Sequence, residues 1–242
     1  MSRLSIITVV YNAKADLDLT LKSIKSQTVH TEVIVIDGGS SDGTVEIIKN
    51  NSDIVSNYIS EKDQGIYDAM NKGILNATGE WIYFLNAGDV FHDSQTLELL
   101  VSQCDPKETD IIYGDVIILG ANQFQFQLNC DVSKMVIHHQ GICYKKDLHN
   151  KVGKYVVNKK FTIADYFFFY LILPFRWRKT SFVFAICDGG GVSSKMKSFY
   201  AKNAVDFLFG RLTISKFTTF VVFYPFYKLL KKVLNLKSLY AK

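Results

Sequence analysis

A chain of 242 residues can form one large domain, or one domain with an appendage, and its 48% hydrophobic residues can bury a sizeable core. This composition excludes an intrinsically disordered protein. The net charge of +5 is unevenly distributed, because the only acidic residues from Arg176 onward are Asp188 and Asp206. The C-terminal third is therefore expected to meet an anionic partner. Without a nucleic-acid-binding motif, a membrane surface fits better than nucleic acid.

The cysteines indicate the compartment. Cys104, Cys130, Cys143 and Cys187 lack the C-x-x-C spacing of a zinc site, so packing is their expected role. The chain opens on a strand-like run, without a charged segment and a cleavable apolar stretch. We therefore expect a cytoplasmic protein with free thiols.

The first ninety residues alternate between two patterns. Apolar runs predict strands over residues 4–10, 32–37, 54–60 and 80–85, and amphipathic spacing predicts helices over residues 16–26, 44–50 and 66–77. This alternation favours parallel strands joined by right-handed crossovers, with helices on both faces. The expected fold class is α/β, with a Rossmann-like, mostly parallel central sheet.

The pattern changes after Leu85. Helices are predicted over residues 94–102 and 162–173, strands over residues 110–119, 124–128 and 181–187, and a loop at glycines 189–191. We expect the first hundred residues to build the mouth of the sheet and the next ninety to cover it.

Polar clusters follow the predicted strands and can converge on one crevice. Tyr11 offers a flat face for a base. Asp37 is placed to contact a base edge or a ribose, or simply to cap the next helix. Asp89 suits Mg²⁺ or Mn²⁺ held jointly with substrate phosphates. Neither G-x-x-x-x-G-K-[ST] nor G-x-G-x-x-G occurs, which weakens NTPase and dinucleotide interpretations.

Four motifs in order carry a resemblance. They are SIITVVYN at residues 5–12, IDGGSSDGT at 36–44, EKDQGIYDAMNKG at 61–73 and GEWIYFLNAGD at 79–89. The series resembles family 2 glycosyltransferases, and within them bacterial enzymes that extend lipid-linked sugars for O-antigen, colanic acid or capsule. The likeness continues loosely through residues 139–141, 163–166 and 189–193.

The resemblance implies a GT-A fold that binds a nucleotide sugar, most often a UDP-sugar, usually with Mn²⁺ or Mg²⁺. By position, it places Tyr11 and Asp37 against the nucleotide. It also implies that Asp68 and Asn71 line the same pocket, from the helix that begins near Ile66.

The resemblance implies the reactive residues as well. Asn86 and Asp89 occupy the place of the family's Asp-x-Asp, where Asp89 would meet metal and diphosphate. Asp165 falls where inverting members carry the catalytic base, and His139 and Gln140 would be acceptor-side or structural residues. One carboxylate that deprotonates the acceptor hydroxyl during a single displacement would invert the anomeric configuration. A glycosidase would instead need two carboxylates flanking the bond.

Some residues depart from the family pattern. Gly38 stands where a second acidic or amide residue is common. Asn86 and Gly88 stand where carboxylates are frequent. Shortly after Asp165, where a second acidic residue is common, this chain has Phe167. An inactive, nucleotide-sugar- or membrane-binding relative is therefore an alternative, since function is decided by the site and not by the fold. Without the resemblance, Asp165 would be read as a helix cap.

The C-terminal segment completes the expected organisation: a glycosyltransferase domain over residues 1–195 and a helical, basic and aromatic segment over 196–242. The apolar run at 217–227 is too short to span a bilayer, and the lysines that follow suit an amphipathic helix at the inner face of the cell membrane. There it would meet a polyprenyl-diphosphate-linked saccharide acceptor. The alternatives are a helix packed on the domain, an oligomer contact, or an enzyme with a soluble acceptor.

Overall fold

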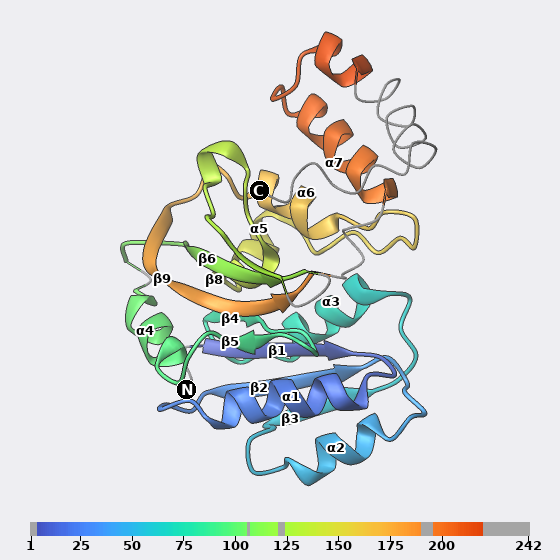
Figure 1. Cartoon of the computed structure of the whole chain (residues 1–242), viewed down its shortest axis with the longest axis vertical. Helices are drawn as coiled ribbons and strands as arrows, with labels where there is room; N and C mark the ends of the chain where they lie inside the picture. The colour runs from blue at the N-terminus through green and yellow to red at the C-terminus, as the bar shows by residue number, and fades with distance from the viewer. Residues whose placement is uncertain (1–3, 106, 121–123, 190–195, 220–242) are drawn as a thin grey trace. The chain divides into compact units, whose positions relative to one another are not determined.

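A computed structural model describes residues 4–105, 107–120, 124–189 and 196–219 (Figure 1). Contacts divide the chain into two units. The larger contains Met1–Lys160 and Ala164–Gly191, and the smaller contains Phe161–Ile163 with Val192–Lys242. The domain boundary expected after residue 195 stays a prediction.

The elements of the larger unit alternate as expected over the first half and then become mixed. They are β1 (Leu4–Val10), α1 (Lys14–Lys25), β2 (Glu32–Asp37), α2 (Thr44–Asn50), β3 (Asn57–Ser60), α3 (Ile66–Asn76), β4 (Trp81–Phe84), β5 (Val90–Phe91), α4 (Thr96–Gln103), β6 (Ile111–Leu119), β7 (Gln125–Leu128), the 3-10 turns η2 (Val132–Lys134) and η3 (His139–Gly141), β8 (Ile142–Lys145), α5 (Leu148–Val152), α6 (Ala164–Leu171) and β9 (Trp177–Asp188).

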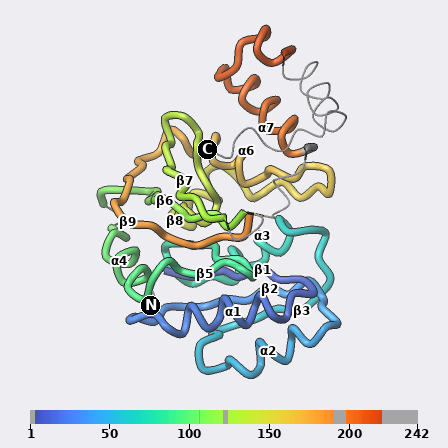
Figure 2. Tube along the Cα trace, in the orientation of Figure 1, coloured from blue at the N-terminus to red at the C-terminus, as the bar shows by residue number. Residues whose placement is uncertain are grey.

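Within the described residues, nine strands form one sheet in the order β3-β2-β1-β4-β8-β6-β9-β5, with β7 paired to β6. The four strands β3, β2, β1 and β4 are parallel, so their carboxyl ends lie at one edge. β8 enters antiparallel to β4, and β9 runs parallel to β6 (Figure 2). The predicted α/β fold with a Rossmann-like, mostly parallel central sheet is confirmed.

The two faces of β1 explain how the helices cover the sheet. Leu4 and Ile6 belong to the core cluster that contains Leu17 and Leu21 of α1. The alternate side chain, Ile7, meets α3 on the other face, because successive side chains of a strand point to opposite sides. A Cβ at Gly73 would lie 2.4 Å from Ile7 Cγ2. A residue without a side chain is what allows α3 to pack this closely.

Several elements differ from the sequence prediction. β3 begins at Asn57, not at residue 54, because Ile54 and Val55 donate backbone hydrogen bonds to Asn51 in a turn. β9 begins earlier than predicted, at Trp177, since it pairs along the whole length of β6. The prediction missed β5, whose two residues are too short for a periodic signal, and β8, which pairs with β4 on one side and β6 on the other.

The four cysteines are buried and unpaired, as expected. In the smaller unit, α7 (Met196–Leu208) is followed by a turn and by helical residues 214–219, with Phe207 stacked on Phe217 at 4.9 Å. In the described part of the chain, no helix is long and apolar enough to cross a membrane. The aromatic run at 217–227 lies mostly outside the described residues, as do the lysines from Lys228 onward and the glycines at positions 190 and 191.

Candidate active site

The loops after β1 and β2 are tied together at the carboxyl edge of the sheet. Asn12, at φ 46°, accepts a hydrogen bond from the Ser41 amide at 2.9 Å and donates its own amide to Ser40 Oγ at 2.7 Å. These bonds fix the backbone on either side of Tyr11. The Tyr11 side chain is 64% exposed, and its ring is available for stacking at the mouth of the sheet.

Asp37 faces the interior of its own turn. Its carboxylate accepts hydrogen bonds from the Ser40 amide at 3.0 Å, from Ser40 Oγ and from Ser60 Oγ at 2.6 Å, and the residue is fully buried. These bonds hold the turn against β3. The structure thus gives Asp37 the capping geometry that turn chemistry allows, while contact with a nucleotide stays a prediction.

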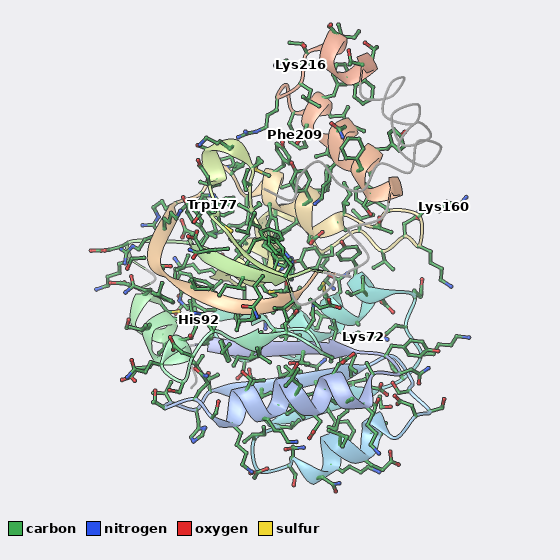
Figure 3. The ribbon with its side chains drawn as sticks, viewed as in Figure 1. Lys72, His92, Lys160, Trp177, Phe209 and Lys216 are labelled. Atoms are coloured by element: carbon green, nitrogen blue, oxygen red, sulfur yellow. The ribbon has the colours of Figure 1, made fainter. Side chains whose placement is uncertain are left out.

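Three carboxylates surround Lys72 of α3. Its ammonium binds Asp63 Oδ1, Glu61 at 2.8 Å and Asp68 at 3.4 Å, and the side chain is 19% exposed. Figure 3 labels Lys72 near the carboxyl end of the parallel strands. Burial raises the pKa of Asp63, and the negative charges of Asp68 and Glu61 add to this effect against the opposing ammonium. Asp68 also accepts the Gln64 amide at 3.0 Å, which closes the start of α3.

Asn71 fastens a distant loop to α3. Its Nδ2 donates to the Tyr155 carbonyl at 2.9 Å, and its Oδ1 accepts the Tyr155 amide at 3.0 Å. The side chain is buried, and both ends of its amide are used by this backbone. Asn71, expected to line the nucleotide pocket, is placed to hold the loop around Tyr155.

The turn from Asn86 to Asp89 follows β4. Gly88 adopts φ 97°, which explains why glycine stands where a carboxylate was expected. Thr20 of α1 fixes the turn: its hydroxyl donates to the Asp89 carbonyl at 2.8 Å and accepts the Gly88 amide at 3.0 Å. Asn86 Oδ1 is buried and, among the described residues, has no hydrogen-bond partner. The Oδ1 atom of Asn86 is thus available as a ligand close to Asp89.

Asp89 is a buried carboxylate with polar partners. Gln140 Nε2 donates to its Oδ2 at 2.6 Å, and the backbone amide of Asp188, at the end of β9, donates to its Oδ1 at 3.2 Å. Burial raises the pKa of Asp89 to about 7, and the Asp188 charge acts in the same direction against the hydrogen bonds. The Asp188 carboxylate is therefore close enough for its charge to raise the pKa of Asp89.

Asp165, in the first turn of α6, is held from two sides. Tyr67 Oη donates to its Oδ1 at 2.7 Å, and His139 Nδ1 lies 3.5 Å from its Oδ2. Burial alone would raise the pKa of Asp165, but the hydrogen bond and charge of His139 and the hydroxyl of Tyr67 lower it to about 2. Its side chain keeps 22% exposure, so an ionised base remains accessible to an acceptor hydroxyl.

Two consecutive residues of η3 connect the carboxylates. His139 approaches Asp165 and Gln140 binds Asp89, while Tyr83 of β4 donates to the Gln140 carbonyl at 2.8 Å. The His139 ring packs against Phe84, with centroids 4.9 Å apart, and both of its ring nitrogens are buried. Its Nδ1 faces the Asp165 carboxylate at 3.5 Å, the outer limit of hydrogen-bonding distance.

The residues fit a divalent cation that shares its ligands with substrate. In the described residues, no three His, Cys, Asp or Glu side chains are grouped to hold a metal alone. A cation held by one or two carboxylates plus phosphates needs no such group. Asp89 could supply one carboxylate to such a cation, Asp188 a second one, and Asn86 its unpartnered side-chain oxygen.

The sequence profile described as Glycosyl transferase family 2 matches residues 5–171. The chain belongs to this family. A PGL/p-HBAD biosynthesis glycosyltransferase found in Mycobacterium bovis and Mycobacterium tuberculosis is 36% identical over 177 residues, covering 68% of this chain and 67% of the relative. The glycosyltransferase AglE of Haloferax volcanii is 36% identical over 118 residues, 46% of this chain and 38% of that protein.

Solved structures agree on the fold of this family 2 member. S. aureus TarS 1–349 in complex with UDP superposes with a TM-score of 0.69 at 16% identity, covering 97% of this chain and 75% of that one. Mannosyltransferase PcManGT from Pyrobaculum calidifontis, in complex with GDP-Man and Mn²⁺, gives 0.60 at 16% identity, covering 84% and 60%. The GT-A fold and the glycosyltransferase family predicted from sequence are confirmed. The narrower likeness to O-antigen, colanic acid or capsule enzymes stays a prediction.

Sequence reasoning missed functional neighbours of the predicted residues. Tyr67 lies inside the third motif, but nothing in the sequence says that its hydroxyl reaches Asp165, 98 positions away. Thr20 and Asp188 carry no local signal either, because both act on Asp89 only through the folded sheet.

Proposed function

We propose that this family 2 glycosyltransferase is inverting. It moves a hexose or an N-acetylhexosamine from a nucleotide sugar, most often a UDP-sugar, to a saccharide carried on polyprenyl diphosphate. The observation that carries the proposal is the η3 turn, whose adjacent residues His139 and Gln140 engage Asp165 and Asp89. This turn connects Asp165, an accessible ionised carboxylate, to Asp89, a buried carboxylate suited to a site for the leaving diphosphate.

The chemistry follows from the different surroundings of these carboxylates. Asp165 accepts the proton of the acceptor hydroxyl while the hydroxyl oxygen bonds to the anomeric carbon. The bond from that carbon to the diphosphate oxygen breaks in the same displacement, and the electron pair leaves with the nucleoside diphosphate. An α-linked donor then gives a β-linked product. Tyr67 and His139 keep Asp165 ionised and oriented until it takes up this proton.

Asp89, with Asn86 and Asp188 beside it, would hold Mn²⁺ or Mg²⁺ together with the diphosphate. Such a cation, when bound, neutralises charge that develops on the departing oxygen. The PcManGT complex with GDP-Man and Mn²⁺ supports divalent metal use in a protein of this fold. TarS structures with UDP and with UDP-GlcNAc support a nucleotide-sugar donor.

The membrane-linked acceptor is supported by the smaller unit. The end of α7 and the residues that follow it expose apolar side chains, with Leu208 74%, Phe209 42% and Ile214 69% exposed. The exposed cations Arg211 and Lys216 accompany them; Phe209 and Lys216 are labelled in Figure 3. An apolar tip beside cations suits an anionic lipid surface, at the inner face of the cell membrane.

The catalytic assignment is tested by nucleoside-diphosphate release with Mn²⁺, a UDP-sugar and a lipid-diphosphate-linked sugar. Asp165→Asn and Asp89→Ala are expected to lose at least about a hundredfold in rate, as removal of a general base or a metal ligand does. Asp53→Asn is the matched control, because Asp53 is half-exposed in an ion pair with Lys25. NMR of the product anomer tests inversion. Full activity in both variants would overturn the residue assignments.

The membrane assignment has its own test. Full-length protein should float with vesicles that contain anionic lipid and stay behind with neutral vesicles. Phe209→Ser combined with Ile214→Ser should reduce flotation, while Leu75→Ser, which alters an equally exposed side chain on α3, should not. Equal flotation of all variants would refute the role of Phe209 and Ile214, and a wild type that does not float would favour a soluble acceptor.

A further inference from the structure

Residues 153–160 lie between α5 and α6 and form an irregular segment, the 153–160 loop. Asn71 holds the backbone of Tyr155 in this loop at both its amide and its carbonyl. The Tyr155 ring is buried, and its centroid lies 5.7 Å from that of Tyr67, whose hydroxyl donates to Asp165. The loop is therefore connected to the proposed base through two packed aromatic rings.

The second half of the loop faces solvent with apolar and cationic side chains. Its last five residues are all exposed, beginning with Val156 at 44% and Val157 at 38%. Lys159 and Lys160 end the loop, and Figure 3 labels Lys160. The Lys160 amide donates to Asn158 Oδ1 at 2.8 Å, which orders the turn that carries both lysines. Apolar surface and positive charge are thus presented next to each other.

The positive charge of the loop is not compensated nearby. Lys154 is exposed as well, so the loop carries three lysines, and residues 148–164 contain no Asp or Glu. In the part of the chain that the structure describes, no carboxylate forms an ion pair with any of the three. Lys151 of α5, by contrast, binds Asp147 at 2.9 Å. A group of unpaired cations attracts an anionic ligand.

We propose that the 153–160 loop binds the diphosphate and the first isoprenoid units of the acceptor lipid. The three lysines neutralise the diphosphate, and Val156 and Val157 contact the hydrocarbon chain that is bonded to it. The saccharide extends from the diphosphate toward Asp165, where its hydroxyl is deprotonated. This assignment rests on the proposed function and gives its lipid-linked acceptor a binding site in the larger unit.

Two features favour this occupant over a general contact with the bilayer. Asn71 and the ring of Tyr155 fix the loop relative to Asp165, as a substrate that reacts at Asp165 requires. A general membrane contact needs no such fixed distance from the base. The apolar and cationic residues are also neighbours in the loop, which matches a ligand whose diphosphate and hydrocarbon chain are directly bonded.

Titration calorimetry of the full-length protein with farnesyl diphosphate tests the assignment. The titrations contain saturating UDP and no divalent cation, so that the donor site is filled and the diphosphate cannot bind through a metal. The wild type should bind farnesyl diphosphate more tightly than farnesol or inorganic diphosphate, because only farnesyl diphosphate carries both groups. Its affinity should fall as the NaCl concentration is raised, since salt screens exposed charges.

Two double variants separate the two contacts. Lys159→Gln combined with Lys160→Gln should weaken the binding of both farnesyl diphosphate and inorganic diphosphate by about tenfold, because both ligands lose charge-assisted contacts. Val156→Ser combined with Val157→Ser should weaken farnesyl diphosphate by about tenfold and leave inorganic diphosphate unchanged, because only the isoprenoid chain loses apolar contact.

Each double variant has a matched control in the larger unit. Lys49→Gln combined with Lys107→Gln removes two exposed lysines outside the loop and should not change the binding of farnesyl diphosphate. Leu75→Ser combined with Val136→Ser alters two apolar side chains that are 60% and 38% exposed, and it should not change this binding either. A loss in these controls equal to that in the loop variants would refute a specific site.

The possible outcomes are distinguishable. A wild type that binds no UDP, even with Mn²⁺, would overturn the proposed function and this assignment with it. A wild type that binds UDP but not farnesyl diphosphate would overturn the assignment alone, and so would wild-type affinity for farnesyl diphosphate in both loop variants. Loop variants that keep this affinity but no longer float with phosphatidylglycerol vesicles would show that the loop contacts the bilayer instead. If one loop variant is unfolded by circular dichroism, the other decides.

Discussion

The hydrogen bond between Gln140 and Asp89 is expected to influence the pKa of Asp89, and this influence can be measured. Gln140 Nε2 donates to Asp89 Oδ2 at 2.6 Å in a buried setting. A hydrogen bond to a charged group contributes about 1.5–3 kcal/mol, and one pKa unit corresponds to about 1.4 kcal/mol. Gln140→Leu should therefore raise the pKa of Asp89 by about one to two units above its value of about 7.

Mn²⁺ binding reports this change, because the cation binds the deprotonated carboxylate and its affinity falls when the group is protonated. In the wild type, affinity in the presence of UDP should rise with pH and level off above about pH 8, since the pKa of Asp89 is about 7. In Gln140→Leu the rise should move upward by about one to two units. At pH 7 the variant should bind about five- to fiftyfold more weakly, and the curves should converge at high pH.

Calorimetric titrations between pH 6 and 9.5 make the measurement. Gln127→Leu is the matched control, because Gln127 also donates to an aspartate, Asp115, at 3.0 Å, but in an exposed position. An affinity loss in Gln140→Leu that is the same at every pH would indicate displaced ligands and refute the electrostatic argument. An unchanged midpoint would refute it too.

Two further predictions concern other hydrogen-bonded carboxylates. Tyr67→Phe removes one of the two groups that hold Asp165, so kcat should fall about tenfold with KM nearly unchanged. Tyr58→Phe, which alters an exposed ring, should leave the kinetics unchanged. Equal kinetics in the two variants would contradict the role of Tyr67. Asp110→Asn should lower the free energy of unfolding by about 1–3 kcal/mol at pH 7, because Arg176 donates two side-chain hydrogen bonds to Asp110, each at 2.9 Å. Those bonds hold the pKa of Asp110 below its ordinary value, so the difference in denaturant unfolding should persist above about pH 4 and shrink below it; a difference that grows in acid would contradict this.

The alternating half of the fold was predictable because its signals are local. Residues 4–10 and 32–37 were predicted with the bounds that the structure gives β1 and β2, since buried parallel strands are continuous apolar runs. β8 was not predictable in the same way. Its four residues pair with β4 on one side and β6 on the other, so its partners decide its conformation.

The types of residue at the site could be predicted from the sequence, but the directions in which their side chains point could not be predicted as well. Sequence placed Asp37 and Asp89 near one edge of the sheet, but it does not say which carboxylate points into its own turn. Asp37 is satisfied by Ser40 in the loop after β2 and by Ser60, the last residue of β3. Likewise, the motif around Asn71 predicts ligand contact, and this stays a prediction; the structure shows that the amide holds the backbone of Tyr155.

The η3 turn has a consequence for how this enzyme can diversify. Adjacent Cα atoms are about 3.8 Å apart, so under the proposed function the peptide between His139 and Gln140 ties the residue that contacts Asp165 to the residue that contacts Asp89. Any substitution that shifts the turn disturbs both at once, and Tyr83 anchors it to the central sheet. Changes of donor or acceptor are therefore expected to accumulate in the surrounding loops, such as residues 61–65, around a reactive centre whose dimensions are inherited unchanged.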